Sequence, residues 1–342
     1  MISRRQLLIA VGASPLAASF WSFAQQQSKV WRIGFLFAGT LAQRPQAQGF
    51  WEGLKELGYV PGKNILIEIR EAEGKTEKLP DLAKELVSWK PDVIVAVTPP
   101  AVAAAQGATR SIPIVMAITG DISRYGFVKN VSRPEGNITG TTSYFDNLNS
   151  KRLQLLKEML PHVSRIGILW NAKNAYGTTV QQVEEPAKML GVQLRPLPFQ
   201  GPNDLETALA RAISERCEAL LVLSDAVTFD LRAKVIAFAA EKKLPTFYQF
   251  PEEAYEGGLA AYGVNLFEEY RRVGPYVDKI LKGARPGDLP IEQPTIFEMV
   301  INIKTAKTLG IKIPNSILVR ADKVIERRSV VTFLLRLGQV RS

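Results

Sequence analysis

Residues 165–173 read RIGILWNAK, and residues 32–40 read RIGFLFAGT. Each stretch begins Arg-Ile-Gly, continues as a short apolar run and ends in small or polar residues. Short apolar runs bounded in this way are typical of strands that are buried on both faces of a parallel sheet. A chain of 342 residues that contains the same strand twice is expected to form two lobes of one architecture.

Other strand landmarks recur in the same order in both halves. Their offsets are 133, 126 and 132 residues, which makes chance similarity a poor explanation. The pairs are Arg32 with Arg165, Thr98 with Ser224, and Pro113 with Pro245. We therefore predict two doubly wound α/β lobes with parallel, Rossmann-like sheets.

Strand-like and helix-like segments alternate between these landmarks. In the first half, strands are predicted at 31–39, 65–69, 92–98 and 112–118, with helices at 45–58, 78–89 and 100–109. In the second half, strands are predicted at 165–170, 193–199, 218–224 and 244–250, with helices at 175–190, 203–215 and 228–242. Amphipathic helices between short apolar strands cover both faces of a parallel sheet.

The chain continues well past two complete lobes. Residues 257–265 predict a further strand and residues 268–282 a further helix. Such an extension indicates that the chain crosses between the lobes more than once, and several crossings form a hinge. We expect lobes of residues 30–146 plus about 255–285 and of residues 147–254 plus about 286–326, followed by a tail at 327–342.

The N-terminus has the three parts of an export signal. Arg4 and Arg5 form the charged region, an apolar stretch follows, and Ser22-Phe23-Ala24 is a cleavage pattern, so residues 1–24 are expected to be removed. The pair of arginines fits either a twin-arginine signal or an ordinary secretory signal. No cysteine follows to carry a lipid. We expect a periplasmic protein without a membrane span, with a formal charge near +8 instead of +10.

The composition excludes several kinds of chemistry. With one cysteine, Cys217, and one histidine, His162, the chain forms no internal disulfide, no Cys-rich zinc site and no Ser-His-Asp triad. It contains no phosphate loop, and its basic residues alternate with acidic ones instead of forming a nucleic-acid-binding stripe. We therefore expect no catalytic residues, no cofactor, no metal and no nucleic-acid partner.

Three stretches resemble a known family. FEMVINIKTAKTLGIKIPNSILVRADKVIE at 297–326 resembles the C-terminal signature of the tryptophan/tyrosine-type ABC transporter substrate-binding proteins, within the periplasmic binding protein type I superfamily. GNITGTT at 136–142 and PDVIVAVTPPAVAAAQ at 91–106 support this resemblance, which covers about residues 30–326. The chain departs from the pattern after Glu326, where an apolar stretch from Val330 to Leu337 follows.

The resemblance implies a two-lobed receptor joined by a multi-strand hinge. Such a receptor closes on a small-molecule solute and delivers it to an ABC permease in the inner membrane. The solute implied for this group is an aromatic or branched amino acid. The same fold also serves as a ligand-sensing module for a signalling partner, and this is the alternative function.

The strand ends locate the expected site, because ligands of doubly wound sheets bind beyond the carboxyl ends of the strands. Two facing lobes present two such edges to one cleft. In the first lobe the candidates are Ala38, Gly39, Thr40, Thr98, Pro99, Pro100, Thr119 and Asp121. In the second lobe they are Trp170, Asn171, Asn174, Ser224, Asp225, Tyr248 and Tyr262.

Several candidates have a structural role as their alternative. Thr98 and Ser224 either cap the helices that follow them or help to hold a ligand carboxylate at the helix N-terminus. Asp225 either takes a ligand ammonium or is an N-cap. An enzyme acting through two carboxylates is a weaker alternative, for which Asp121 and Asp225 are the only pair that we nominate.

The aromatic and amide candidates have alternatives of their own. Trp170, Tyr248 and Tyr262 either pack in the core or cover a ligand. Asn171 and Asn174 are turn formers or polar ligand contacts. Because the two opening stretches differ most where each strand ends, we expect ligand specificity to be set there.

Overall fold

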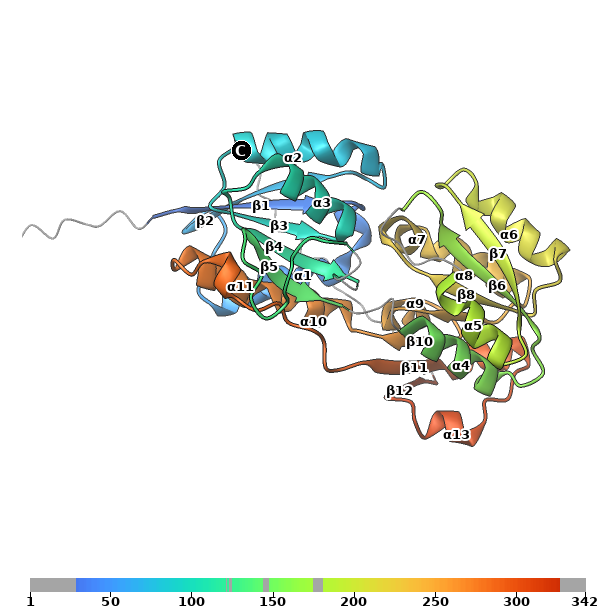
Figure 1. Ribbon diagram of the computed structural model, residues 1–342. Helices are drawn as coiled ribbons and strands as arrows, with labels where there is room; N and C mark the ends of the chain where they lie inside the picture. The colour runs from blue at the N-terminus through green and yellow to red at the C-terminus, as the bar shows by residue number, and fades with distance from the viewer. Residues whose placement is uncertain (1–28, 121, 123–124, 144–147, 175–180, 327–342) are drawn as a thin grey trace, which may run out of the picture.

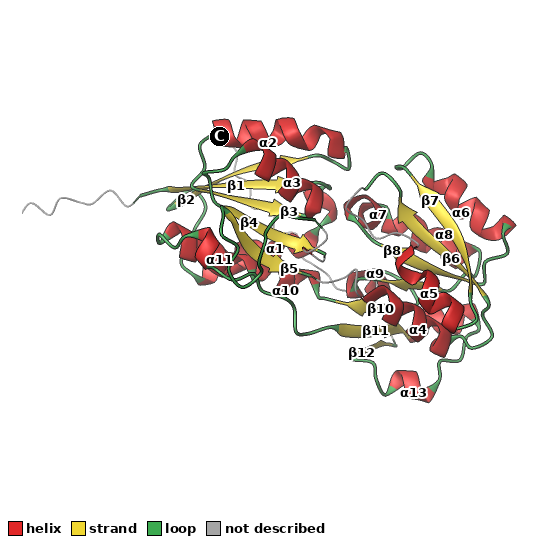
Figure 2. Cartoon of the chain, in the orientation of Figure 1, coloured by secondary structure: helices red, strands yellow, loops and turns green. Residues whose placement is uncertain are grey.

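The computed structural model describes residues 29–120, 122, 125–143, 148–174 and 181–326. The expected export signal at 1–24, the candidate Asp121 and the tail at 327–342 lie outside the described residues. Two α/β lobes stand side by side (Figure 1), and each has its own sheet with helices on both faces (Figure 2). Among the described residues, no helix is both long and apolar enough to cross a membrane.

The first lobe has a five-stranded sheet in the order β2-β1-β3-β4-β5, and all its pairings are parallel. The strands are β1 (Trp31–Phe37), β2 (Ile65–Glu71), β3 (Val93–Val97), β4 (Ile114–Thr119) and β5 (Ile138–Thr142). The helices between them are α1 (Gln48–Glu56), α2 (Leu79–Ser88) and α3 (Pro99–Ala108). All residues of β3, β4 and β5 are buried, as a sheet covered on both faces requires.

The second lobe has a seven-stranded sheet in the order β12-β11-β10-β9-β8-β6-β7. Its strands are β6 (Arg165–Asn171), β7 (Gln193–Phe199), β8 (Ala219–Leu223), β9 (Thr246–Tyr248), β10 (Ala260–Gly263), β11 (Glu298–Asn302) and β12 (Lys323–Ile325). Its helices are α4 (Asn149–Met159), α5 (Gln181–Met189), α6 (Leu205–Ser214), α7 (Ala226–Asp230), α8 (Arg232–Glu241), α9 (Pro251–Tyr255), α12 (Ile303–Leu309) and α13 (Asn315–Leu318). Only β11 runs antiparallel to its neighbour β10 among these described pairings.

The two sheets share the doubly wound order that the repeats predict. β2-β1-β3-β4-β5 in one lobe corresponds to β7-β6-β8-β9-β10 in the other, so the fold prediction is confirmed. The repeated Arg-Ile-Gly begins β1 and β6. The backbone N–H of Arg32 donates to Asp92 at 2.8 Å, and that of Arg165 donates to Glu218 at 2.9 Å. The repeated letters therefore build the strand start, which is the end away from the other lobe.

The chain crosses between the lobes three times, between β5 and α4, between β10 and α10, and between Glu292 and β11. After the second crossing, α10 (Leu266–Arg271) and α11 (Val273–Leu281) pack on the first lobe against α1 (Figure 1). Multiple crossings were expected. The boundary expected at 146/147 lies between β5 and α4, whereas the second and third crossings occur later in the chain than expected.

Hydrogen bonds show at which residues the second and third crossings occur. The strand expected at 257–265 is β10, which pairs with β9 and β11 of the second sheet, so the chain returns to the first lobe only near Leu266 and not at 255. It stays there until Glu292, because the N–H of Thr142 donates to the Glu292 carbonyl at 2.9 Å. The expected departure at 286 was therefore early.

Some helices also differ from the prediction. The helix expected at 268–282 is divided into α10 and α11, and the helix expected at 228–242 is divided into α7 and α8. Of the helix expected at 175–190, only residues from 181 onward lie among those that the structure describes. The strand β5 and the helix α4 carry weaker apolar patterns and were not among the predicted elements.

Candidate ligand-binding site

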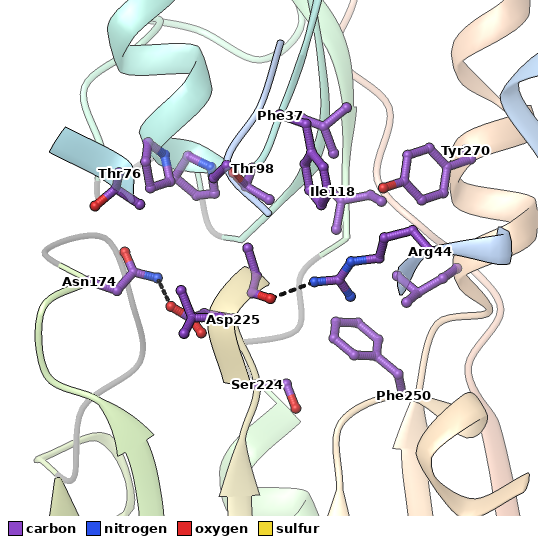
Figure 3. A pocket seen from close by; sticks show the side chains of 17 residues that line it. Phe37, Arg44, Thr76, Thr98, Ile118, Asn174, Ser224, Asp225, Phe250 and Tyr270 are labelled. Atoms are coloured by element: carbon purple, nitrogen blue, oxygen red, sulfur yellow. Dashed lines mark hydrogen bonds between the residues drawn. The ribbon is translucent and has the colours of Figure 1, made fainter. Parts of the chain in front are cut away.

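A pocket lies between the two lobes, at the carboxyl ends of β1 and β3 on one side and of β6 and β8 on the other (Figure 3). These strands flank the point where the strand order reverses in each sheet, which is where ligands of doubly wound folds bind. The lining residues are Phe37, Ala38, Arg44, Thr76, Val97, Thr98, Pro99, Pro100, Ile118, Asn174, Ser224, Asp225, Ala226, Val227, Phe250, Leu266 and Tyr270.

Asp225 provides the negative charge of the pocket. One carboxylate oxygen accepts hydrogen bonds from the N–H and the hydroxyl of Thr228, at 2.7 and 2.9 Å. The other accepts from the side-chain amides of Asn171 and Asn174, at 2.8 and 2.9 Å. Asp225 is thus an N-cap of α7, and neutral donors alone hold it among the described residues. Its charge stays available to a cation in the pocket.

The opposite end of the pocket is apolar. Phe37 and Ile118 come from the ends of β1 and β4, Phe250 precedes α9, and Leu266 and Tyr270 belong to α10. In Figure 3, Phe37, Ile118, Phe250 and Tyr270 lie around the side chain of Arg44, at the opposite end from Asn174. The pocket therefore combines a negative end with an apolar, largely aromatic end, and this division suits a ligand that is itself amphipathic.

Thr98 has a strained backbone. Its φ of 81° and ψ of 151° lie in a region that is essentially restricted to glycine. Its hydroxyl is buried and has no hydrogen-bond partner among the described residues. Ile118, at the end of the neighbouring strand, also has a positive φ, of 50°. Strain at two pocket residues is characteristic of a site whose geometry serves binding at a cost in stability.

Helix α3 offers less to an anion than its sequence position suggested. Its first two residues are Pro99 and Pro100, which have no amide hydrogen, and the N–H of Val102 already donates to the Thr98 carbonyl at 3.1 Å. Of the donors at this helix start, the Ala101 N–H and the Thr98 hydroxyl remain. In the first lobe, these two groups are therefore the donors that the start of α3 leaves for a ligand carboxylate.

We predict that Thr98→Gly stabilises the ligand-free protein. Glycine adopts this backbone conformation without steric cost, and relief of the strain should raise the free energy of unfolding by about 1 kcal/mol after the entropy cost of glycine. Urea denaturation measures the change. Thr98→Ala, which removes the same unpaired hydroxyl but keeps the Cβ and the strain, is the control and should be less stable than the glycine variant. Equal or lower stability of the glycine variant would show that the backbone is not strained.

The two lobes contact each other beside the pocket. Arg44 of the first lobe forms an ion pair with Asp230 of the second at 3.0 Å, and its Nη2 donates to the Ala226 carbonyl at 2.7 Å. The backbone N–H of Thr40 donates to the other carboxylate oxygen of Asp230 at 3.0 Å. A Cβ on Gly39 would lie 2.9 Å from that oxygen and 2.9 Å from the Phe37 ring, so a side chain there would have to displace one of them. Gly39 and Thr40 therefore hold the lobes together and do not line the pocket.

Seven of the expected site residues do line the pocket, from both lobes. They are Ala38, Thr98, Pro99, Pro100, Asn174, Ser224 and Asp225. Ser224 donates to Glu253 of α9 at 2.7 Å. Burial raises the pKa of Glu253 to about 7 and that of its neighbour Glu252 to about 8. Ser224 thus connects the pocket lining to the carboxyl groups of Glu252 and Glu253, which lie next to the second crossing.

Other expected residues lie elsewhere, and these expectations are corrected. Tyr248 is fully buried in the core of the second lobe, and Trp170 packs against the apolar cluster of that lobe. Tyr262 stacks near Phe297, with ring centroids 6.2 Å apart. Successive residues of a strand point to opposite faces of the sheet. A side chain at a strand end therefore reaches the cleft only when it points to the face that borders the cleft.

The two remaining polar candidates have structural roles. The hydroxyl of Thr119 is buried and donates to the Thr141 carbonyl at 3.4 Å, which joins β4 to β5. The side-chain amide of Asn171 donates to Asp225 and so helps to position its carboxylate, but Asn171 does not line the pocket.

Sequence reasoning missed ten lining residues. Phe37, Val97 and Ile118 each directly precede a residue that the sequence analysis nominated, so a window wider by one residue would have included them. Phe250 ends the strand predicted at 244–250, so the strand-end rule could also have found it. Arg44, Thr76, Leu266 and Tyr270 have no such signal, since loops and the crossing helix α10 bring them to the pocket. Ala226 and Val227 directly follow the predicted Asp225.

A two-lobed α/β protein with a pocket between facing strand ends has the architecture of the type I periplasmic binding proteins. The family model described as ABC transporter substrate binding protein matches residues 41–325, and the chain belongs to that family.

Individual relatives agree with this assignment. The chain is 27% identical over 266 residues to the tyrosine-binding protein of Clostridioides difficile, covering 78% of this chain and 76% of that protein. A Streptococcus pneumonia ABC domain in complex with L-Trp is 27% identical, with a TM-score of 0.78, and the match covers 86% of this chain and 99% of that one. A conserved domain protein from Vibrio cholerae is 28% identical, with a TM-score of 0.77 and coverage of 86% and 100%.

Proposed function

We propose that this protein is the periplasmic receptor of an ABC importer and that it binds an amino acid with an aromatic or other large apolar side chain. The observation that carries the proposal is the division of the pocket into a negative end at Asp225 and an apolar end around Phe37, Phe250 and Tyr270. Two relatives, one a tyrosine-binding protein and one in complex with L-Trp, support the same ligand class.

The chemistry of each end sets the orientation of the ligand. The α-ammonium binds Asp225, whose hydrogen-bond donors among the described residues are all neutral groups. The α-carboxylate accepts from the Thr98 hydroxyl and from the free N–H of Ala101 at the start of α3. The side chain extends between Phe37 and Phe250 toward Tyr270 (Figure 3). In this orientation the amino acid contacts both lobes.

A ligand that contacts both lobes favours the closed arrangement, since its contacts are complete only there. The three crossings form the hinge, and the Arg44–Asp230 pair beside the pocket supports closure. The exported, closed receptor then presents its solute to a membrane permease. Delivery requires that the closed state be recognised, whereas catalysis plays no part in this proposal.

A thermal-shift screen of L-amino acids, aromatic acids and nucleosides tests the proposal. We expect aromatic L-amino acids to raise the melting temperature, because a ligand that binds only the folded state stabilises it by mass action. Small-angle X-ray scattering should then show a smaller radius of gyration with the active compound. Stabilisation by nucleosides or sugars but by no amino acid would overturn the ligand class, and stabilisation without compaction would overturn hinge closure.

A further inference from the structure

Two hydrogen-bonding groups lie unpaired at the apolar end of the pocket. The side chain of Arg44 is 5% exposed, and its Nε–H has no partner among the described residues. The Tyr270 side chain is buried, and its hydroxyl forms no hydrogen bond with any residue that the structure describes. In Figure 3 this hydroxyl points toward the pocket, on the same side as Arg44. Buried polar groups without partners are uncommon and call for an explanation.

The surroundings of Arg44 hold its guanidinium in place. It stacks on Phe229, with the central guanidinium carbon 4.0 Å from the centroid of that ring. The same carbon lies 5.4 Å from the centroid of the Phe37 ring. Its Nη2 is occupied by the Ala226 carbonyl and by Asp230. The Nε–H is therefore a donor whose position is set by contacts made elsewhere on the same side chain. Such a preorganised donor favours a ligand acceptor, since little ordering remains to be done on binding.

The charge at this end limits which acceptor fits. Asp230 neutralises Arg44 at 3.0 Å, so the pair offers directed hydrogen bonds but no net charge. A second carboxylate here would compete with Asp230 for the same guanidinium. A neutral oxygen accepts from the Nε–H without that competition, and the Tyr270 hydroxyl is able to donate to the same oxygen or accept from it.

We infer that the pocket selects a ligand with a neutral hydroxyl at the far end of an aromatic side chain, a phenol, over the same ligand without the hydroxyl. The inference rests on the proposed function, because it assumes an amino acid with its ammonium at Asp225. A phenol oxygen pairs both unmet groups at once. A plain phenyl ring leaves the buried Arg44 Nε–H unpaired and offers nothing to the Tyr270 hydroxyl, and an unpaired buried donor is a situation in which sites discriminate strongly.

Isothermal titration with L-tyrosine and L-phenylalanine tests the inference, because these two ligands differ by one oxygen. We expect the wild-type protein to bind L-tyrosine at least about tenfold more tightly. Tyr270→Phe and Arg44→Lys should each reduce this ratio at least about threefold. Lysine keeps a positive charge opposite Asp230 but has no Nε–H.

Tyr276→Phe is the matched control, because the Tyr276 hydroxyl donates to the Pro290 carbonyl at 2.6 Å, outside the pocket. The ratio of its affinities for L-tyrosine and L-phenylalanine should remain that of the wild type. Equal binding of the two amino acids by the wild type, or an unchanged ratio in both pocket variants, would overturn this inference and leave the proposed function standing. Binding of neither amino acid would overturn both.

Discussion

Asp225→Asn is expected to weaken binding of an amino-acid ligand by about ten- to a hundredfold. The substitution removes the negative charge that the ligand ammonium meets, and hydrogen bonds to charged groups contribute about 1.5–3 kcal/mol. Asparagine is as good an N-cap as aspartate, so the Oδ1 contact with Thr228 and the start of α7 should persist. The amide nitrogen that replaces the second carboxylate oxygen is unable to accept from Asn171 and Asn174, so a modest loss of stability should accompany the loss of affinity. Titration calorimetry with L-tyrosine measures the affinity, and urea denaturation measures the stability.

Asp204→Asn is a suitable control for this experiment. Asp204 is the N-cap of α6 in the same lobe, and its carboxylate accepts from the Gln200 N–H at 3.0 Å, outside the pocket. The two variants make the same chemical change at the same helix position. If Asp225→Asn bound L-tyrosine as well as Asp204→Asn does, Asp225 would be a cap alone and the assigned ligand orientation would be wrong.

Gly49→Ala is expected to lower the free energy of unfolding by about 3 kcal/mol. Helix α1 packs against α10, and a Cβ on Gly49 would lie 2.2 Å from the Phe267 carbonyl oxygen. A backbone oxygen is unable to rotate away as a side chain would, so the helices must separate, and overpacking of this kind costs about 1–3 kcal/mol or more. Because α10 also carries Leu266 and Tyr270, the separation should disturb the pocket.

Gly107→Ala, in contrast, is expected to raise the free energy of unfolding. Gly107 is exposed within α3, and an added Cβ would meet nothing within 4 Å. Alanine there should stabilise the protein by about 0.5–1 kcal/mol, the usual gain over glycine inside a helix. Urea denaturation of both variants compares the two glycines directly. Equal midpoints would mean that α1 and α10 do not pack as closely as described.

The residues that sequence analysis placed in the pocket share one property. Ala38, Thr98, Ser224 and Asp225 directly follow a buried parallel strand, and the end of such a strand can be read from local apolar periodicity. Once two lobes are recognised, the topology brings these ends to one cleft. Local pattern and general fold rules were sufficient for them.

The aromatic residues show where local pattern fails. Trp170 and Asn171 are neighbours at the end of β6, yet the indole packs in the core while the amide supports Asp225. Side chains alternate between the faces of a strand, and which face meets the cleft depends on the helices packed against the sheet. The divergence of RIGILWNAK from RIGFLFAGT therefore reflects lobe packing and the support of Asp225.

The sequence alone determined the two lobes, the strand order and the first row of pocket residues, because hydrophobic periodicity and parallel-sheet topology act locally and repeat in the chain. Only the tertiary structure decided how the apolar end of the pocket is completed, where Arg44, Leu266 and Tyr270 come from segments outside the predicted strand ends. Their proximity depends on the crossings and on the packing of α10 against α1. Contacts of this kind join residues far apart in the sequence and leave no local signal.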